Sequence, residues 1–357
     1  MKKFFCQILK SIFTISLSLI ILVSVVSLKT NLSFTTTLTY LKSIARETLN
    51  INIPEEPPLD FEEELILTSS NNSYYYIQLD NNAKIIYAAL ENNIDNLLKE
   101  NYIINFYTTF NNLLNTTTGK YKLNKAFQSA LDAFFYDHPE LFYLDMTKII
   151  LNTTCVSIGN TKTYTVEIRP IGNTYLRDDF NTESDAIIAI MQVENIKNNI
   201  INEVSQKNIY NQIKEVHDIL VNMINYDSTY QKSNTHSIYG ALIEKQVVCE
   251  GYAKAFKYIM DGLNVECILI AGTSISPSGE TESHMWNYVK LNNNWYGVDV
   301  TWDDPIINGG SVKDNLRHDF FMKGKTAFRD THEPSGKISN EGMLFSLPIL
   351  SDNNYKK

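Results

Sequence analysis

The sequence is poor in cysteine and lacks glycine-rich phosphate loops. Only four cysteines occur among 357 residues, Cys6, Cys155, Cys249 and Cys267, and no two stand at the close spacing of a structural zinc site. Disulfide scaffolds need many more cysteines than this. There is also no internal repeat. We therefore predict that the protein uses no cofactor and no metal.

Positive charge is also in short supply. The formal net charge is −9 and the pI is about 5.3, so the chain as a whole repels polyanions. This balance predicts no nucleic-acid partner. Hydrophobic residues make up 44% of the chain, which is enough for packed cores, and the length suits two modest domains.

The first 30 residues predict a membrane segment. Lys2, Lys3 and Lys10 precede an uncharged apolar run at 11–28, which is about the minimum length for a spanning helix. We read 1–30 as a signal-anchor that leaves the basic end in the cytoplasm. The remainder would be exported, giving a single-pass cell-membrane protein with an extracellular C-terminal region. A cleaved signal peptide, and hence secretion, is the open alternative.

Three cysteines follow the apolar run, which is an odd number, so at least one thiol has no partner within the exported chain. A disulfide between Cys155 and Cys267 is left open.

The region after the apolar run divides into a linker and a first folded unit. Paired prolines and acids near Pro57 predict an extended linker over 31–72. A small α+β domain is expected at 73–180. Its predicted elements are helices at 83–100 and 123–136, then strands at 147–158 and 161–168 joined by a Gly159-Asn160 turn.

The last region, 181–357, begins with helices and continues with strands. Apolar periodicity predicts helices at 186–204, at 210–226 and from Cys249 to Met260, and β-forming runs predict strands at 266–271, 284–291 and 295–302. Helices followed by an antiparallel sheet define an α+β fold.

Cys249 falls on the first turn of the third helix. The apolar positions from Tyr252 onward follow helical spacing, and Gly262 is placed to end the helix. Counting back puts Cys249 on the inward stripe at the helix start. The free N–H groups there stabilise a thiolate, which makes the sulfur a better nucleophile.

His284 and Asp299 are expected on one face of a hairpin. If Asn292 and Asn293 form a two-residue turn, Leu291 faces Asn294 and His284 lies diagonally across from Asp299. A four-residue loop would pair His284 with Asp299 directly, and only an odd slip would separate them.

Together these residue types suit acyl transfer. Imidazole can take the thiol proton and return it to a leaving amine, while a carboxylate fixes the imidazole tautomer. We expect Cys249 as nucleophile, His284 as base and Asp299 as the residue that orients the base. The N–H of Cys249 is the natural first oxyanion donor, and Tyr239 and Gln246 are candidates for the second.

Three sequence blocks carry a family resemblance. They are Val248-Cys249-Glu250-Gly251-Tyr252-Ala253, His284-Met285-Trp286-Asn287 and Trp295 to Pro305, which reads WYGVDVTWDDP. In this order they resemble the transglutaminase-like core of bacterial, clostridial-type surface proteins. The resemblance implies a papain-like core in which a Cys-bearing helix packs on an antiparallel sheet, and it implies the same three catalytic residues.

The resemblance leaves the reaction open. Members of the family include amide hydrolases, acyl transferases that crosslink glutamine to lysine, and catalytically silent relatives. Animal crosslinking enzymes place Trp directly after the nucleophile, whereas Glu250 stands here. We expect a protein or peptide substrate at the cell surface. A silent binding or scaffold protein is the main alternative, and a metal-dependent hydrolase is a third.

The remaining polar residues are predicted to be structural. Asp303 and Asp304 precede Pro305 and predict a turn rather than a calcium site. Four further histidines lack any ligand spacing: His217, His236, His318 and His332.

Overall fold

The structure is a computed structural model that describes residues 73–229, 232–275, 279–304 and 316–357. The predicted membrane segment and the linker lie outside the described residues. Among the described residues, no helix has the length and apolar character needed to cross a bilayer.

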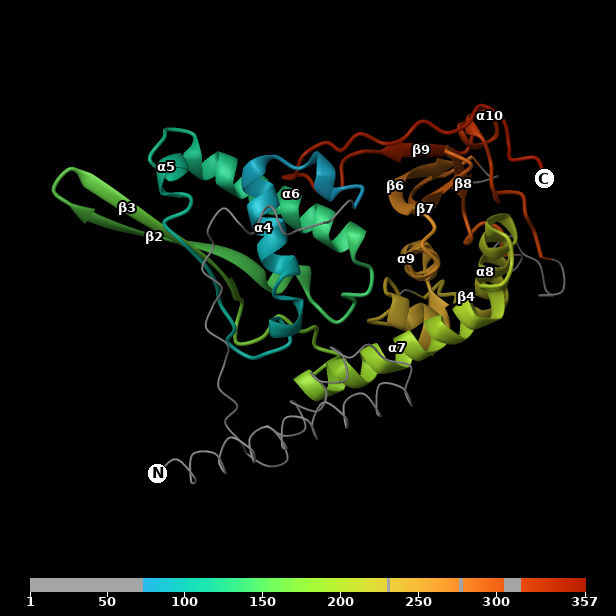
Figure 1. The fold of residues 1–357 in the computed structure, drawn as a ribbon, viewed down its shortest axis with the longest axis horizontal. Helices are drawn as coiled ribbons and strands as arrows, with labels where there is room; N and C mark the ends of the chain where they lie inside the picture. Colours follow the sequence, from blue (N-terminus) through green and yellow to red (C-terminus); the bar gives the residue numbers. More distant parts are fainter. Residues whose placement is uncertain (1–72, 230–231, 276–278, 305–315) are drawn as a thin grey trace, which may run out of the picture.

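The N-terminal half contains helices and a three-stranded antiparallel sheet with strand order β1-β3-β2. Its elements are η1 (Tyr76–Gln78), α4 (Asn81–Glu91), η2 (Ile94–Asn96), β1 (Ile104–Tyr107), α5 (Asn111–Leu114), α6 (Gly119–Asp137), η3 (Met146–Lys148), β2 (Ile149–Ile158) and β3 (Thr161–Pro170). Figure 1 shows the β2–β3 hairpin reaching away from the rest of the molecule. The predicted turn is present, since Ile158 pairs with Thr161 and Gly159 has φ +60°.

The C-terminal half contains the Cys-bearing helix and a four-stranded antiparallel sheet with order β8-β7-β6-β9. Its elements are α7 (Glu183–Val204), α8 (Ile209–Met223), β4 (Asn225–Tyr226), η4 (Gly240–Glu244), β5 (Gln246–Val247), α9 (Cys249–Gly262), β6 (Cys267–Ile275), β7 (Thr281–Leu291), β8 (Asn294–Val298), α10 (Lys325–Phe328) and β9 (His332–Ser335). The α+β prediction is confirmed.

Several boundaries differ from the predictions for identifiable reasons. The helix expected at 83–100 ends at Glu91 and is followed by the separate 3₁₀ turn η2. Gly262 is the last residue of α9 and does not itself break the helix. The left-handed residue that turns the chain is Asn264, with φ +57°, because asparagine tolerates that region.

Helix α7 begins after Thr182 with a reciprocal cap. The Thr182 hydroxyl accepts a hydrogen bond from the N–H of Asp185, and the Asp185 carboxylate accepts one from the N–H of Thr182. This reciprocal capping satisfies two N–H groups that the helix geometry leaves free. The division into domains at 73–180 and 181–357 stays a prediction, because one apolar core cluster runs through both halves.

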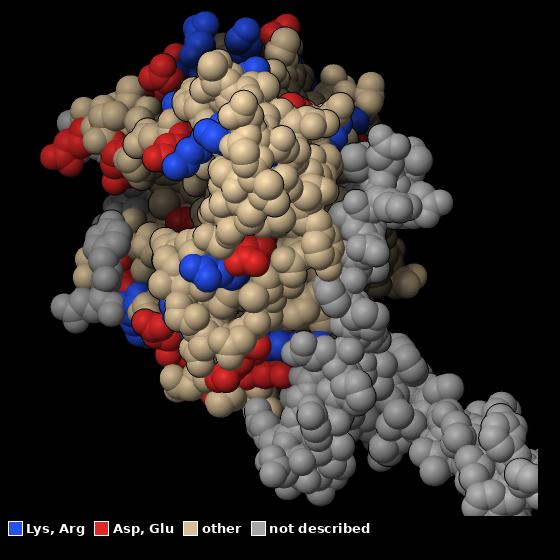
Figure 2. All heavy atoms as spheres, turned by 90° about the vertical axis from the view of Figure 1, so that its left-hand side faces the viewer, with Lys and Arg blue, Asp and Glu red and all other residues tan. Residues whose placement is uncertain are grey.

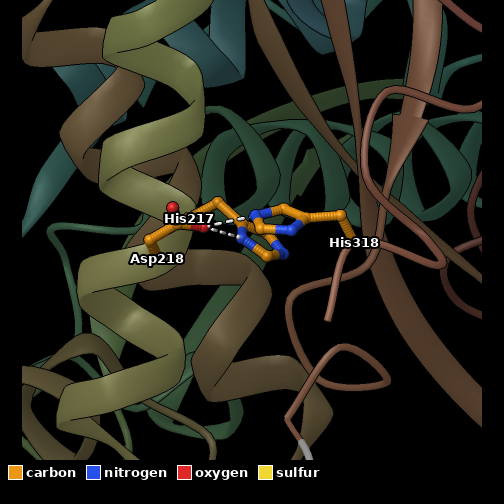
Figure 3. Close-up of side chains that lie close together, drawn as sticks. All are labelled: His217, Asp218 and His318. Carbon is orange, nitrogen blue, oxygen red and sulfur yellow. Dashed lines mark hydrogen bonds and ion pairs between the residues drawn. The ribbon is translucent and has the colours of Figure 1, made fainter. Parts of the chain in front are cut away.

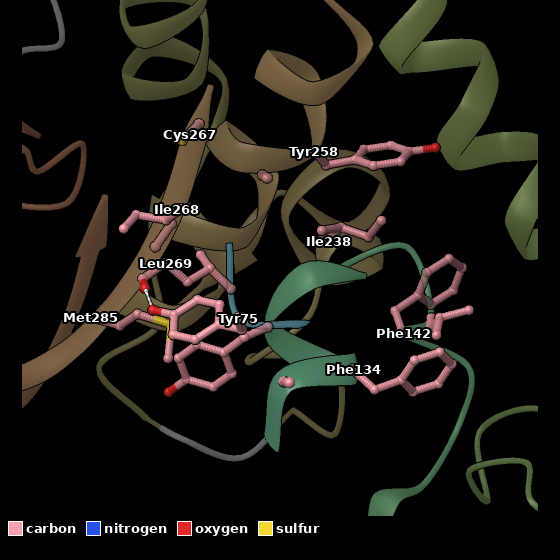
Figure 4. Packing of buried hydrophobic residues seen from close by; sticks show 14 of the residues in the cluster. Tyr75, Phe134, Phe142, Ile238, Tyr258, Cys267, Ile268, Leu269 and Met285 are labelled. Atoms are coloured by element: carbon pink, nitrogen blue, oxygen red, sulfur yellow. Dashed lines mark hydrogen bonds between the residues drawn. The ribbon is translucent and has the colours of Figure 1, made fainter. Parts of the chain in front are cut away.

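Tyr75 shows how the two halves share that core. Its hydroxyl donates to the carbonyl of Leu269 in β6, and its ring contacts Tyr136 of α6 edge to face. Figure 4 shows Tyr75 beside Leu269 and Met285. The C-terminal segment adds a second connection, because the Ser339 hydroxyl donates to Asp132 in α6 at 2.6 Å.

Charges are mixed on the face that carries the β2–β3 hairpin. In the view of Figure 2, Lys and Arg side chains alternate with Asp and Glu over the described residues, without an extended area of one sign.

Candidate active site

A cavity of about 680 Å³ opens between the start of α9 and the edge of the sheet. Cys249 and His284 both line it, together with Gly272 of β6 and Pro334 of β9. The structure therefore brings the predicted nucleophile and the predicted base to one cavity.

Cys249 is the first residue of α9, as predicted. The chain enters the helix through Val248, which is extended at φ −93° and ψ −177°. The first turn lies close against β5, since a Cβ on Gly251 would stand 2.5 Å from the Cβ of Val247. Glycine at 251 therefore permits this approach, which places a free, half-buried thiol at the positive end of α9.

The β7–β8 hairpin has the predicted two-residue turn. Leu291 pairs with Asn294 and Tyr288 with Gly297, and both Asn292 and Asn293 have positive φ, at +50° and +64°. The four-residue alternative is excluded. The register continues to the point where β8 ends at Val298, so Asp299 follows directly on the face that carries His284.

His284 and Asp299 form a buried hydrogen-bonded pair. Nε2 of His284 lies 2.7 Å from Oδ2 of Asp299, and both residues are buried. Burial lowers the pKa of His284, but the Asp299 charge and hydrogen bond outweigh it and raise that pKa to about 10, with a further contribution from Cys249. A carboxylate at Nε2 makes that nitrogen the donor and leaves Nδ1 for the sulfur.

The Asp299 carboxylate is fully engaged. Its Oδ1 accepts from the N–H groups of Thr301 and Trp302 at 3.0 and 3.2 Å, and its Oδ2 accepts from His284. Burial raises the pKa of Asp299, yet the neighbouring imidazole charge and these hydrogen bonds hold it well below its usual range. Asp299 is therefore a fixed anion at the back of His284.

His332 is a site residue that the sequence prediction missed. Its Nε2 lies 3.1 Å from Oδ2 of Asp299, the same oxygen that binds His284. The ring stacks on Phe328 with centroids 4.0 Å apart, and Nδ1 lies 2.8 Å from the Thr331 hydroxyl. Burial and the charge of His284 lower the pKa of His332, so it acts as a neutral donor. The prediction that His332 is structural stays a prediction, but its hydrogen bond to Asp299 places it beside the predicted catalytic residues.

Neither candidate for the second oxyanion donor lines the cavity. The Gln246 amide donates to Asp227 at 3.3 Å, and the Tyr239 ring packs against Phe142 and Phe180. Glu250 does line it, where Lys254 and His236 lower its pKa to about 2 against the effect of burial.

The other polar predictions have mixed outcomes. The strand predicted at 295–302 ends at Val298, and residues 300–303 form a turn that includes Asp303, one of the two acids predicted to lie in a turn. Asp303 also binds His217, with Oδ2 3.0 Å from Nε2, so that His217 is a buried member of a cluster. Cys155 and Cys267 are both free thiols, one exposed and one buried in β6, so the disulfide left open above is not formed.

Comparisons with known proteins identify the family of one part of the chain. Residues 196–300 match the sequence model of the transglutaminase-like superfamily, a range that contains Cys249, His284 and Asp299. The chain therefore contains a transglutaminase-like domain. The kyphoscoliosis peptidases of Mus musculus and Homo sapiens are each 29% identical over 99 residues, covering 25% of this chain. The match spans only 15% of the length of those curated relatives.

Two solved structures are also similar at low identity. A candidate cysteine protease from Cytophaga hutchinsonii is 16% identical with a TM-score of 0.26, covering 43% of this chain and 64% of that one. A structure described as a TGase is 12% identical with a TM-score of 0.29, covering 42% and 45%.

Proposed function

We propose that this chain is a cysteine enzyme that acts on amide bonds of proteins or peptides through a thioester on Cys249. The observation that carries the proposal is the His284 imidazole. It is hydrogen bonded to the buried Asp299 anion and opens to the same cavity as the sulfur at the start of α9.

The reaction divides into two steps with balanced proton transfers. The Cys249 sulfur, its proton held by His284, attacks the amide carbonyl carbon and forms the C–S bond. The C–N bond then breaks, and the leaving amine takes the proton from His284. In the second step His284 deprotonates water or an amine, which attacks the thioester and releases Cys249. Hydrolysis and transamidation share the thioester and differ only in this acceptor.

The helix start supplies the electrostatics for the first step. The N–H groups of Cys249 and Glu250 precede the first hydrogen bonds of α9, since the N–H of Gly251 already donates to the Val248 carbonyl, and the helix dipole is positive there. The N–H of Cys249 is thus the first oxyanion donor in the proposal. The names of the curated relatives, which are peptidases, support amide chemistry.

The proposed setting is the cell surface. The apolar run at 11–28 with its basic flank would anchor the chain in a membrane and place the transglutaminase-like domain outside a bacterial cell, in reach of protein substrates. Secretion after cleavage of this segment is the alternative.

The test is mass spectrometry of glutamine-containing peptides incubated with the full chain in mild detergent, with and without a primary amine. Amine addition, deamidation and chain cleavage each change the peptide mass differently, so the product identifies the acceptor. The matched controls are Cys249→Ala, which should abolish every product, and Cys155→Ala, which removes an exposed thiol of the hairpin and should change nothing. Products that survive in Cys249→Ala would refute the proposal. No product from any chain would favour the silent binding protein.

A further inference from the structure

A second group of titratable side chains lies on α8, outside the Cys249 cavity. His217 and Asp218 of α8 meet His318, which comes from the C-terminal segment, and one ligand atom from each lies within 4.8 Å of the others. Figure 3 shows the two imidazoles converging on the Asp218 carboxylate. We infer that His217, Asp218 and His318 form a binding site for a zinc-class divalent cation.

The distances between the ligand atoms are close to those expected around a zinc ion. Oδ1 of Asp218 lies 3.0 Å from Nδ1 of His217 and 2.7 Å from Nε2 of His318. Ligand atoms about 2.0–2.1 Å from a tetrahedral zinc ion lie about 3.3 Å apart. The two separations that involve Oδ1 of Asp218 therefore need to grow by only about 0.3–0.6 Å to reach this spacing. The two imidazole nitrogens lie within 4.8 Å of each other, and rotation of the His318 side chain can adjust that distance.

The residue behind His217 supports the same assignment. Nε2 of the buried His217 lies 3.0 Å from Oδ2 of Asp303, a fully buried carboxylate whose Oδ1 accepts from the N–H of Phe320 at 3.0 Å. A carboxylate that holds one imidazole nitrogen as donor aims the other nitrogen at the metal, and this pattern recurs behind zinc-bound histidines. His217 thus offers Nδ1 with its orientation fixed.

The donor set selects the class of ion. Two imidazoles and one carboxylate suit zinc and its neighbours, whereas calcium and magnesium prefer oxygen ligands throughout. Asp218 also lines an open cavity of about 400 Å³ with Glu203 and Asn222, so one of the three proposed ligands is reached from solvent.

Binding must displace a proton, because the ion takes the place of the hydrogen bond between Nδ1 of His217 and Oδ1 of Asp218. Lys214, paired with Asp218 through its other oxygen, opposes a cation at this position.

The site would hold α8 against the C-terminal segment and the turn after Asp299. The N–H of Asp303 lies 3.3 Å from the carbonyl of Asp299, so the cluster adjoins the triad without facing its cavity. This role is structural, and it does not depend on Cys249 being catalytic.

The test uses the full chain in mild detergent, stripped with a chelator and titrated with Zn²⁺ against a chromophoric competitor. We expect one tight equivalent for the wild type, a loss of that equivalent in His318→Ala and in Asp218→Asn, and tighter binding in Lys214→Met. His318 and Lys214 are partly exposed, so these variants are expected to fold, and far-UV circular dichroism checks this. If His318→Ala misfolds, His318→Gln takes its place.

The control excludes the other histidine cluster, because His284, Asp299 and His332 also converge. His332→Phe removes one potential ligand of that cluster and should keep the equivalent unchanged. Co²⁺ should give tetrahedral d–d bands without a thiolate charge-transfer band. Absence of tight binding in the wild type overturns the inference. So does a binding equivalent that survives in His318→Ala, or one that is lost in a folded His332→Phe.

Discussion

Replacement of Asp299 by asparagine is the sharpest test of the triad. The carboxylate receives only donors: two backbone N–H groups at Oδ1, and the Nε2 atoms of His284 and His332 at Oδ2. An asparagine has the same shape but only one acceptor oxygen, and its amide group is a donor. Each of its two orientations therefore has a specific cost.

If the asparagine oxygen faces the histidines, its amide group opposes the N–H groups of Thr301 and Trp302. Two buried donors then lose their acceptor, at about 1–3 kcal/mol each. If the amide group faces the histidines instead, His284 and His332 need only move a proton from Nε2 to Nδ1. The second orientation costs less, because the Thr331 hydroxyl can accept from Nδ1 of His332.

In that orientation His284 presents an N–H to Cys249 and cannot take the thiol proton. The corresponding change in a serine-protease triad reduces kcat about 10⁴-fold through the wrong tautomer. We expect a loss of amide-bond chemistry of about 10³–10⁴-fold here.

Alkylation by iodoacetamide at pH 6.5 measures this without a known substrate. An ordinary thiol is about 1% thiolate at that pH, so a Cys249 paired with imidazolium should react about 10–100-fold faster than the exposed Cys155 of the same molecule. In Asp299→Asn the two rates should converge. Equal rates in the wild type, or an unchanged ratio in a folded Asp299→Asn, would refute the reasoning.

Three further outcomes follow from the same geometry. The pKa of His284 is raised from about 6.5 in the unfolded chain to about 10 in the folded protein. Its contribution to the free energy of unfolding is therefore full below about pH 6.5 and is lost as the pH rises through about 10. In urea unfolding, the free energy of unfolding should fall less between about pH 7 and 10 in Asp299→Asn than in the wild type. His332→Phe should cost about 1.5–3 kcal/mol in urea unfolding, with partial rescue by His332→Gln, since only Gln can donate to the carboxylate; equal costs would contradict this role. Gly272→Ala places a Cβ 2.2 Å from the carbonyl oxygen of Glu333, so β9 must move, and we expect a loss of about 1–3 kcal/mol together with slower alkylation of the active thiol.

The local parts of the site could be predicted because each rests on a short-range rule. The helix start at Cys249 follows from apolar spacing over the next three turns. The hairpin register follows from Asn292 and Asn293, two residues that tolerate positive φ. Once the turn is fixed, the two-residue side-chain period of a strand places His284 and Asp299 on one face.

The role of His332 could not be predicted because its strand carries almost no pattern. β9 has four residues, three of them exposed, and it contains Pro334. It pairs with β6 across about sixty residues of sequence, so that Ser274 faces His332. No turn or periodicity connects two such segments, and a single sequence holds no other record of the pairing.

The cluster on α8 was missed for a related reason. His217 and His318 stand 101 positions apart, and a ligand spacing is recognisable only when ligands come from one element or one tight loop. The adjacent acids at 303 and 304 were assigned to a turn, which is present. Their buried partners come from helices that precede them in the chain by about fifty to ninety residues.

The turn from Asp299 to Asp304 connects these observations. Asp299 binds His284 of β7, Asp303 binds His217 of α8, and Asp304 accepts from the Tyr252 hydroxyl at 2.8 Å. Tyr252 lies one turn after Cys249 on α9. Three buried carboxylates within six residues therefore fix the strand that bears the base, the helix that bears the nucleophile and the neighbouring helix α8. Because buried anions are costly without partners, each of these elements is held in the one arrangement that satisfies all three carboxylates, and that arrangement brings the imidazole and the sulfur to one cavity.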